Sequence, residues 1–283
     1  MPASSLAHVP ALPAMGPAIL LRALFKRPRR PLPSALPEIV SEYRLDSLPL
    51  DDIARYRAAF GFAGEHIPVT WWYLLAQRAH LATMLQPAFP FKIAGLVHME
   101  NALEEHGRAT PDQPLLIRTV LRLLPPSSSG ALRCVLETTG SADGTPVFSC
   151  SSTYLIRRGT SGGAKPSEPD SLPFGSQVAH WTLDSAAGRR YARLSGDWNP
   201  IHLYGWSARL MGMRAPIIHG MHTLAASCAA LERERNARAT RITCRFQAPV
   251  SLGSSVALLA MQGEEFVVKS RDKIAVTGNC MLL

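Results

Sequence analysis

The residues best suited to acid–base chemistry lie close together, between positions 191 and 226 of this 283-residue chain. Asp197 and His202 are five residues apart, and Asn199 and Pro200 lie between them. A carboxylate and an imidazole on one loop can share a water molecule and transfer protons to and from it. Pro200 fixes its own φ and disfavours an α-helical conformation at Asn199, so we expect a stiff turn here rather than an α-helix.

A second feature, eighteen residues after His202, could stabilise negative charge. Gly220 immediately precedes an apolar pattern of helical spacing that begins at Met221. The first N–H groups of a helix have no partner within the helix, and the helix dipole is positive at that end. The Gly220 N–H could therefore bind an oxyanion. Together the two features provide two proton carriers and one anion site.

Two similar halves of the chain must position these residues. In the second half, the loop leads to a helix expected from about residue 216 to 236, and strands follow it. The first half repeats this order around a buried helix expected at Val69–Leu85. Gly61 and Phe62 correspond there to Gly196 and Asp197, so the first half has a phenyl ring in place of the acid. It also lacks the loop that carries the amide and the imidazole.

Alternating apolar residues predict strands in both halves, and Asp143-Gly144 predicts a hairpin turn. We expect domain boundaries where composition changes. Residues 1–40, which are rich in Pro and Ala and include the basic run KRPRRP, are interpreted as an N-terminal arm. Residues 159–177, rich in Gly, Ser and Pro, are interpreted as a linker between a degenerate first domain (41–158) and a catalytic second domain (178–283). Outside the hairpin, the predicted strands are 95–101, 115–124, 241–246, 255–262, 265–271 and 274–282.

Composition excludes several classes of protein. The net charge is +9 and the pI about 9.7, but the basic residues are scattered and no nucleic-acid motif is present, so we predict no nucleic-acid partner. A basic surface suits a phosphate-rich or acidic partner. Five widely spaced cysteines without a CxxC pair predict free thiols and no zinc site. No segment has the length of a membrane span and the N-terminal charge order is not that of a secretory signal, so we expect a cytoplasmic protein.

The run Ser195-Gly196-Asp197-Trp198-Asn199-Pro200-Ile201-His202, with Pro216 and His219-Gly220-Met221 downstream, resembles the hydratase motif of MaoC-like dehydratases. These are the R-specific enoyl-CoA hydratases of the hot-dog fold. The resemblance implies an α+β double hot-dog, in which two long helices are each wrapped by antiparallel strands that form one continuous sheet. It also implies reversible hydration of trans-2-enoyl thioesters to R-3-hydroxyacyl thioesters, on CoA or an acyl carrier protein, without a metal or other cofactor.

The resemblance also implies roles for individual residues. Asp197 and His202 would hold a water molecule and supply the base and acid functions, in an order that the sequence leaves open. Asn199 would orient the pair or the water, and the Gly220 N–H would bind the enolate oxygen. The further candidates for substrate binding are Ser195, His219 and Tyr191. Each of these three also has a structural interpretation, respectively as a turn residue, as packing at the helix start, and as part of the core or a pocket wall.

Two other functions remain open at this point. A hot-dog thioesterase would direct a carboxylate and water at the carbonyl carbon, and a non-catalytic subunit would only bind acyl thioesters. The hydratase motif disfavours the first, and the complete set of acid, amide, imidazole and glycine disfavours the second. A double hot-dog can complete its sheet within one chain, so the protein can be a monomer. The sequence is equally compatible with a homodimer.

Overall fold

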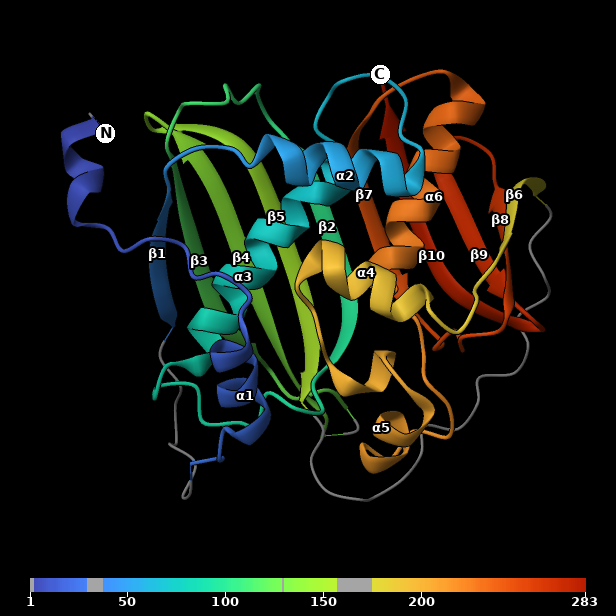
Figure 1. Cartoon of the computed structure of the whole chain (residues 1–283), viewed down its shortest axis with the longest axis horizontal. Helices are drawn as coiled ribbons and strands as arrows, with labels where there is room; N and C mark the ends of the chain where they lie inside the picture. Colours follow the sequence, from blue (N-terminus) through green and yellow to red (C-terminus); the bar gives the residue numbers. More distant parts are fainter. Residues whose placement is uncertain (1–2, 30–37, 129, 157–174) are drawn as a thin grey trace. The chain divides into compact units, whose positions relative to one another are not determined.

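The computed structural model describes residues 3–29, 38–128, 130–156 and 175–283 (Figure 1). Contacts between residues divide the chain into two units. Unit 1 comprises Met1–Ala54 and Trp71–Arg157, and unit 2 comprises Arg55–Thr70 and Arg158–Leu283. The segment 55–70, which precedes the first long helix in sequence, therefore groups with the half that carries the motif.

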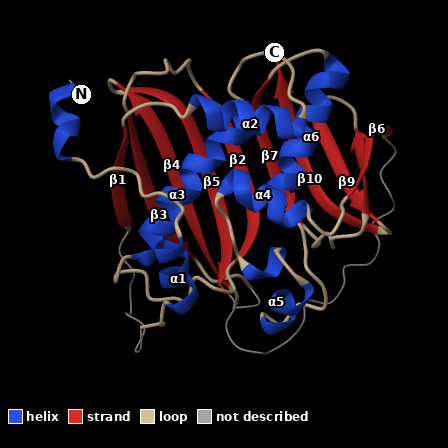
Figure 2. Ribbon diagram, viewed as in Figure 1, coloured by secondary structure: helices blue, strands red, loops and turns tan. Residues whose placement is uncertain are grey.

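Unit 1 consists of an antiparallel sheet and the long helix α3 (Trp72–Leu85), which follows a 3-10 turn at Val69–Trp71. Figure 2 shows α3 in front of these strands, and α3 packs on four of them. Most side chains of α3 are buried, as its nearly continuous apolar sequence predicts. The strand order is β1-β3-β4-β5-β2, with β1 at Ile39–Leu45, β2 at Val97–Glu105, β3 at Leu115–Leu124, β4 at Leu132–Ala142 and β5 at Thr145–Ile156.

The hairpin between β4 and β5 forms where the sequence predicts it. Asp143 and Gly144 have φ values of 48° and 83°, as a two-residue hairpin turn of the type with positive φ at both positions requires. Ala142 pairs with Thr145 across this turn. The β4–β5 pairing shifts register once, between Gly140 and Ser141, and the burial of β4 alternates along its length.

Unit 2 repeats the arrangement with α6 (Gly220–Arg235), which packs on strands β6, β7 and β10. Asn236, in the left-handed conformation, ends α6. Between β6 and α6 lie α4 (Ala187–Ser195), a 3-10 turn at Pro200–His202 and α5 (Gly205–Leu210). The strand order is β7-β10-β9-β8-β6, with β6 at Ser176–Thr182, β7 at Ala239–Phe246, β8 at Ser255–Ala260, β9 at Glu265–Ser270 and β10 at Lys273–Leu282.

The N-terminal residues lie on unit 1. The described part of the expected arm contains a 3-10 helix (Ala3–His8) and α1 (Pro17–Phe25). The ammonium group of Lys26 donates to two carbonyls at the end of α3, and Arg78 of α3 donates to the carbonyls of Leu12 and Pro13. The first strand begins at Ile39, within the expected arm, and α2 (Leu50–Phe60) follows it. Much of the basic run and most of the expected linker 159–177 lie outside the described residues.

Corresponding turns in the two halves support the internal repeat. Gly61 follows the end of α2 with φ 68°, and Gly196 follows the end of α4 with φ 74°. Only glycine adopts this conformation without steric cost. Beyond these turns the halves differ, since Phe62 is a buried core residue whereas Asp197 is only partly buried. None of the helices in the described ranges has the length and apolarity needed to span a membrane.

Candidate active site

The end of α4 fixes the position of Asp197. Gly196 ends the helix, and its N–H donates to the Ala192 carbonyl at 2.8 Å. The Ser195 hydroxyl donates to the Tyr191 carbonyl at 3.0 Å and accepts the Asp197 N–H at 3.2 Å. Ser195 is buried and uses its hydroxyl in both bonds. Its position therefore supports the turn interpretation, and its hydroxyl holds the backbone that presents the carboxylate.

Two local hydrogen bonds, each between a side-chain oxygen and the backbone N–H two residues later, shape the loop after Asp197. One carboxylate oxygen of Asp197 accepts the Asn199 N–H at 3.1 Å, and the Asn199 amide oxygen accepts the Ile201 N–H at 3.3 Å. Such local bonds stabilise turns. A single 3-10 turn at Pro200–His202 follows, which confirms the expected turn. The Asn199 oxygen is thus used by the loop, whereas its NH₂ group can still donate to water or substrate.

His202 is held in one tautomer by the backbone. Its exposed fraction is 8%, and its Nδ1 lies 2.8 Å from the Ile217 carbonyl oxygen. A carbonyl only accepts, so Nδ1 carries the proton and Nε2 carries a lone pair. Nε2 makes no hydrogen bond with any residue in the described part of the chain. His202 is therefore arranged to accept a proton at Nε2.

His219 lies directly against both residues. Its exposed fraction is 3%, and its Nε2–H donates to the Asp197 carbonyl at 3.0 Å. Its ring stacks on that of His202, with centroids 3.7 Å apart and planes at 28°. Three potential metal-ligating atoms, one from each of Asp197, His202 and His219, lie within 4.8 Å of one another. They are close enough together that they could also hold a cation. The His219 ring thus holds the backbone of Asp197 by a hydrogen bond and packs against the ring of His202.

Burial determines the charges of these groups. Burial lowers the pKa of His202, and nearby Asp197 and the Ile217 carbonyl only partly oppose this shift. Burial and then the adjacent His202 hold the pKa of His219 well below its usual value. Burial likewise lowers the pKa of His222, to about 4. At neutral pH the three imidazoles are therefore uncharged, and His202 can act as a base.

Tyr191 forms a wall behind the site. Its side chain is buried and packs on the rings of His219, His222 and Phe60, with centroids 4.8, 5.6 and 6.1 Å apart. Burial, with Tyr56 and Asp197 nearby, raises the pKa of the Tyr191 hydroxyl well above its usual value. The position agrees with the interpretation as core or pocket wall. Phe60, which the sequence analysis did not select, completes this wall from segment 55–70.

Gly220 is the first residue of α6, which begins four residues later than the predicted start at 216. Its N–H is one of those that an α-helix leaves without an intrahelical partner. A Cβ at this position would lie 2.8 Å from a ring carbon of Phe246, so the Phe246 ring of β7 occupies the space that a side chain here would need. The helix therefore presents a backbone donor at its positive end, next to His219.

Gly188, which the sequence analysis did not select, sets the distance between α4 and the loop that carries His202. Gly188 lies in the first turn of α4, and a Cβ there would be 1.9 Å from the His202 carbonyl oxygen. The backbone of His202 thus rests directly on α4. An isolated glycine within a helical pattern is the signal that could have indicated such a close approach.

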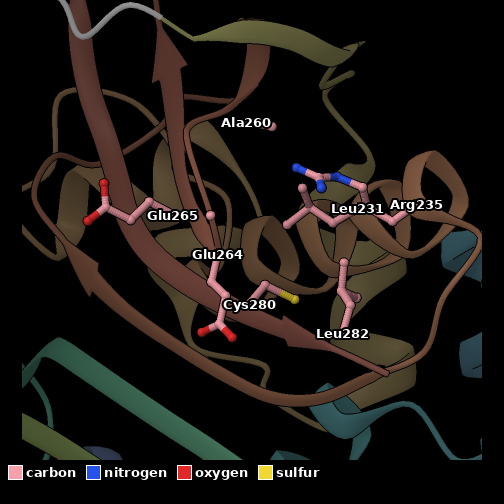
Figure 3. Close-up of a pocket in the computed structure, with 8 residues that line it drawn as sticks. Leu231, Arg235, Ala260, Glu264, Glu265, Cys280 and Leu282 are labelled. Carbon is pink, nitrogen blue, oxygen red and sulfur yellow. The ribbon is translucent and has the colours of Figure 1, made fainter.

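A cavity of about 160 Å³ lies elsewhere in unit 2 (Figure 3). Leu231 and Arg235 line it from the last turns of α6, Glu265 and Cys280 line it from strands β9 and β10, and Glu264 lines it from the turn before β9. Along α6, Arg235 is fifteen residues from Gly220, or roughly 22 Å at 1.5 Å per residue. This cavity is therefore separate from the cluster around His202.

Comparisons with known proteins agree with this geometry. A MaoC-like domain is matched at residues 174–279, a range that contains every candidate site residue. The chain is 30% identical over 227 residues to 3-hydroxyacyl-thioester dehydratase X of Mycobacterium tuberculosis, covering 78% of this chain and 80% of that protein. The chain belongs to the MaoC-like dehydratase family. The resemblance to that family that the sequence indicated is thus confirmed.

Solved structures of MaoC-like and related proteins show the same fold. The crystal structure of HtdX from Mycobacterium tuberculosis has a TM-score of 0.70 at 26% identity and covers 85% of this chain and 99% of that chain. A second protein of that organism, described as having a double hotdog fold, has a TM-score of 0.51 at 16% identity, covering 88% of this chain and 94% of that one. At that identity the second likeness concerns the fold alone. The predicted α+β double hot-dog class is confirmed.

Proposed function

We propose that this MaoC-like chain catalyses the reversible hydration of trans-2-enoyl thioesters to R-3-hydroxyacyl thioesters. The observation that carries the proposal is the neutral His202, whose Nε2 lone pair lies beside Asp197 and next to the start of α6. The name of the relative in Mycobacterium tuberculosis, a 3-hydroxyacyl-thioester dehydratase, supports the same reaction class.

The arrangement supplies what this addition requires. A water molecule held between the Asp197 carboxylate and Nε2 of His202 attacks Cβ of the enoyl group, and one water proton passes to the base. The C=C electron pair moves toward the thioester oxygen, where the Gly220 N–H and the dipole of α6 stabilise the enolate. A proton delivered to Cα completes the product. The Asn199 NH₂ group orients the water or the pair, and we leave the division of the two proton transfers between acid and imidazole open.

Hot-dog thioesterases and non-catalytic acyl-binding subunits are the alternatives. A thioesterase would place the carboxylate and water at the carbonyl carbon and release a free thiol. A binding subunit would not need an imidazole held in the tautomer that leaves Nε2 unprotonated. The tautomer that the Ile217 carbonyl imposes on His202 favours an enzyme over a binding subunit, because it leaves a proton acceptor in the site. Between the two enzymes, the name of the relative, a dehydratase, supports the hydratase.

The remaining features of the proposal follow from the chemistry of the substrate. The thioester is carried on CoA or on an acidic acyl carrier protein, and no metal or redox cofactor takes part. We further propose a cytoplasmic protein, without a nucleic-acid partner, that acts as a monomer or a homodimer. The basic net charge of +9 supports an anionic carrier.

The proposal is tested with purified protein and trans-2-butenoyl-CoA. Loss of the conjugated enoyl absorbance, without release of free thiol, is the expected result. We expect Asp197→Asn and His202→Gln to lower kcat by at least about 10²-fold, the usual contribution of one positioned acid or base. Release of CoA thiol would indicate a thioesterase, and binding without conversion would indicate a binding subunit.

A further inference from the structure

The short helix α5 is rigidly attached to the catalytic loop. The Ser207 hydroxyl of α5 donates to the Pro200 carbonyl at 2.7 Å, and Ser207 is buried. The Ile217 N–H donates to the Ile201 carbonyl at 3.1 Å, which holds the segment that returns from α5 to α6. Figure 1 shows α5 beside the loop that follows α4. A molecule that binds α5 is therefore held next to the residues that would perform the chemistry.

The outer side of α5 is apolar and exposed. Trp206 is 65% exposed and Leu210, four residues later on the same side of the helix, is 78% exposed. Tyr204, just before the helix, is 46% exposed and stacks on Trp206 with ring centroids 6.2 Å apart. We call Tyr204, Trp206 and Leu210 the α5 ridge. Large apolar side chains clustered in this way on a surface indicate an interaction site.

The charge around the α5 ridge is positive. The guanidinium of Arg189 lies over the Tyr204 ring at 4.6 Å and is fixed there by a bond to the Leu203 carbonyl. Arg209, on α5 itself, is exposed, as is Arg214 after it. Residues 198–231 contain no Asp or Glu. An apolar ridge bordered by arginines is complementary to an amphipathic helix that carries acidic side chains.

We propose that the α5 ridge docks an acidic helical carrier domain, which delivers the enoyl group to Asp197 and His202 as a protein-bound thioester. This inference rests on the proposed function and specifies the carrier. A lipid surface suits the ridge less well, because binding to lipid scales with buried apolar area and α5 has only six residues. A nucleotide is also less suited, since small-ligand sites are concave, whereas the ridge projects from a helix.

The experiment compares one enoyl group on two carriers. The trans-2-butenoyl group is presented on an acidic bacterial acyl carrier protein and on free pantetheine, which has neither protein nor nucleotide. For Arg209→Glu and Trp206→Ser, we expect kcat/KM on the protein carrier to fall at least tenfold, with kcat/KM on the pantetheine thioester unchanged. Raising ionic strength should weaken the wild type's use of the protein carrier and affect Arg209→Glu less, because the charge attraction is screened.

Lys273→Glu, at an exposed lysine at the start of β10, is the matched control for the change of charge and should leave both rates unchanged. Equal loss on both carriers, or no loss on either, would overturn the inference. Two further assays, on trans-2-butenoyl-CoA and on anionic vesicles, test the other occupants. A loss confined to butenoyl-CoA would assign the ridge to the nucleotide, and vesicle binding that Trp206→Ser abolishes would assign it to a lipid surface; either result would also overturn the inference. Failure of the wild type on both the protein carrier and the pantetheine thioester would instead contradict the proposed function.

Discussion

Replacing Gly188 by alanine should displace the catalytic loop without touching any reacting group. The added Cβ would lie 1.9 Å from the His202 carbonyl oxygen and 3.0 Å from its carbonyl carbon. Even a crowded Cβ–oxygen contact of 3.0 Å requires α4 and the His202 backbone to separate by 3.0 − 1.9 = 1.1 Å. A displacement of about 1 Å in a positioned group can lower a rate about 10²-fold, which corresponds to about 2.7 kcal/mol in activation free energy.

The assay is kcat/KM on a trans-2-enoyl thioester, per folded protein as measured by circular dichroism. Gly205→Ala is the matched control, because Gly205 begins α5 in the same region and an added Cβ there meets nothing within 4 Å. We expect the control to stay within about twofold of the wild type, in line with small surface changes. If folded Gly188→Ala also stayed within that range, the positioning of His202 by α4 would be refuted.

Three further predictions concern the oxyanion donor, the base and the core. Gly220→Ala and Gly220→Pro both place a Cβ against the Phe246 ring, and Gly220→Pro in addition replaces the N–H hydrogen by a ring carbon, which is tolerated at the first helical position. The kcat of Gly220→Pro should therefore be about 10²-fold below that of Gly220→Ala; equal rates would exclude this donor. Burial lowers the pKa of His202, so the neutral base persists below pH 6.5, and kcat/KM should fall only at more acidic pH; an acid limb centred above pH 6.5 would contradict this. Glu232 is buried and accepts the Ala239 N–H at 2.9 Å, so Glu232→Ala should lower the free energy of unfolding in urea by about 1–3 kcal/mol. The exposed Glu234→Ala should change that free energy little, and equal effects would refute the argument.

The parts of the fold with strong local signals were predictable from the sequence. The long helices follow from apolar runs, and the β4–β5 hairpin follows from Asp143-Gly144. The strand at Ile39–Leu45 was not predicted, because its sequence IVSEYRL is short and mixed, and it is a strand through its pairing with β3. The short α5 was also missed, since its six residues begin with glycine and their conformation depends on bonds to the 3-10 turn.

In the candidate site, too, features with a local sequence signal were predictable and features that depend on tertiary contacts were not. The types and spacing of Asp197 and His202 were enough to predict acid–base chemistry. The tautomer of His202 depends on the Ile217 carbonyl, and the position of Asp197 depends on His219, 22 residues later. The close approach of Gly188 is likewise a tertiary contact. Contacts between segments distant in sequence have no local pattern, so only the structure reveals them.

The most direct test of the account follows the oxygen of water. The protein is incubated with trans-2-butenoyl-CoA in ¹⁸O-labelled water, and the intact thioester product is analysed by mass spectrometry. We predict one ¹⁸O at C3 of an R-3-hydroxybutanoyl thioester, and loss of this product in Asp197→Asn and His202→Gln. Label in a free carboxylate, or unchanged labelling in both variants, would contradict water addition by this pair.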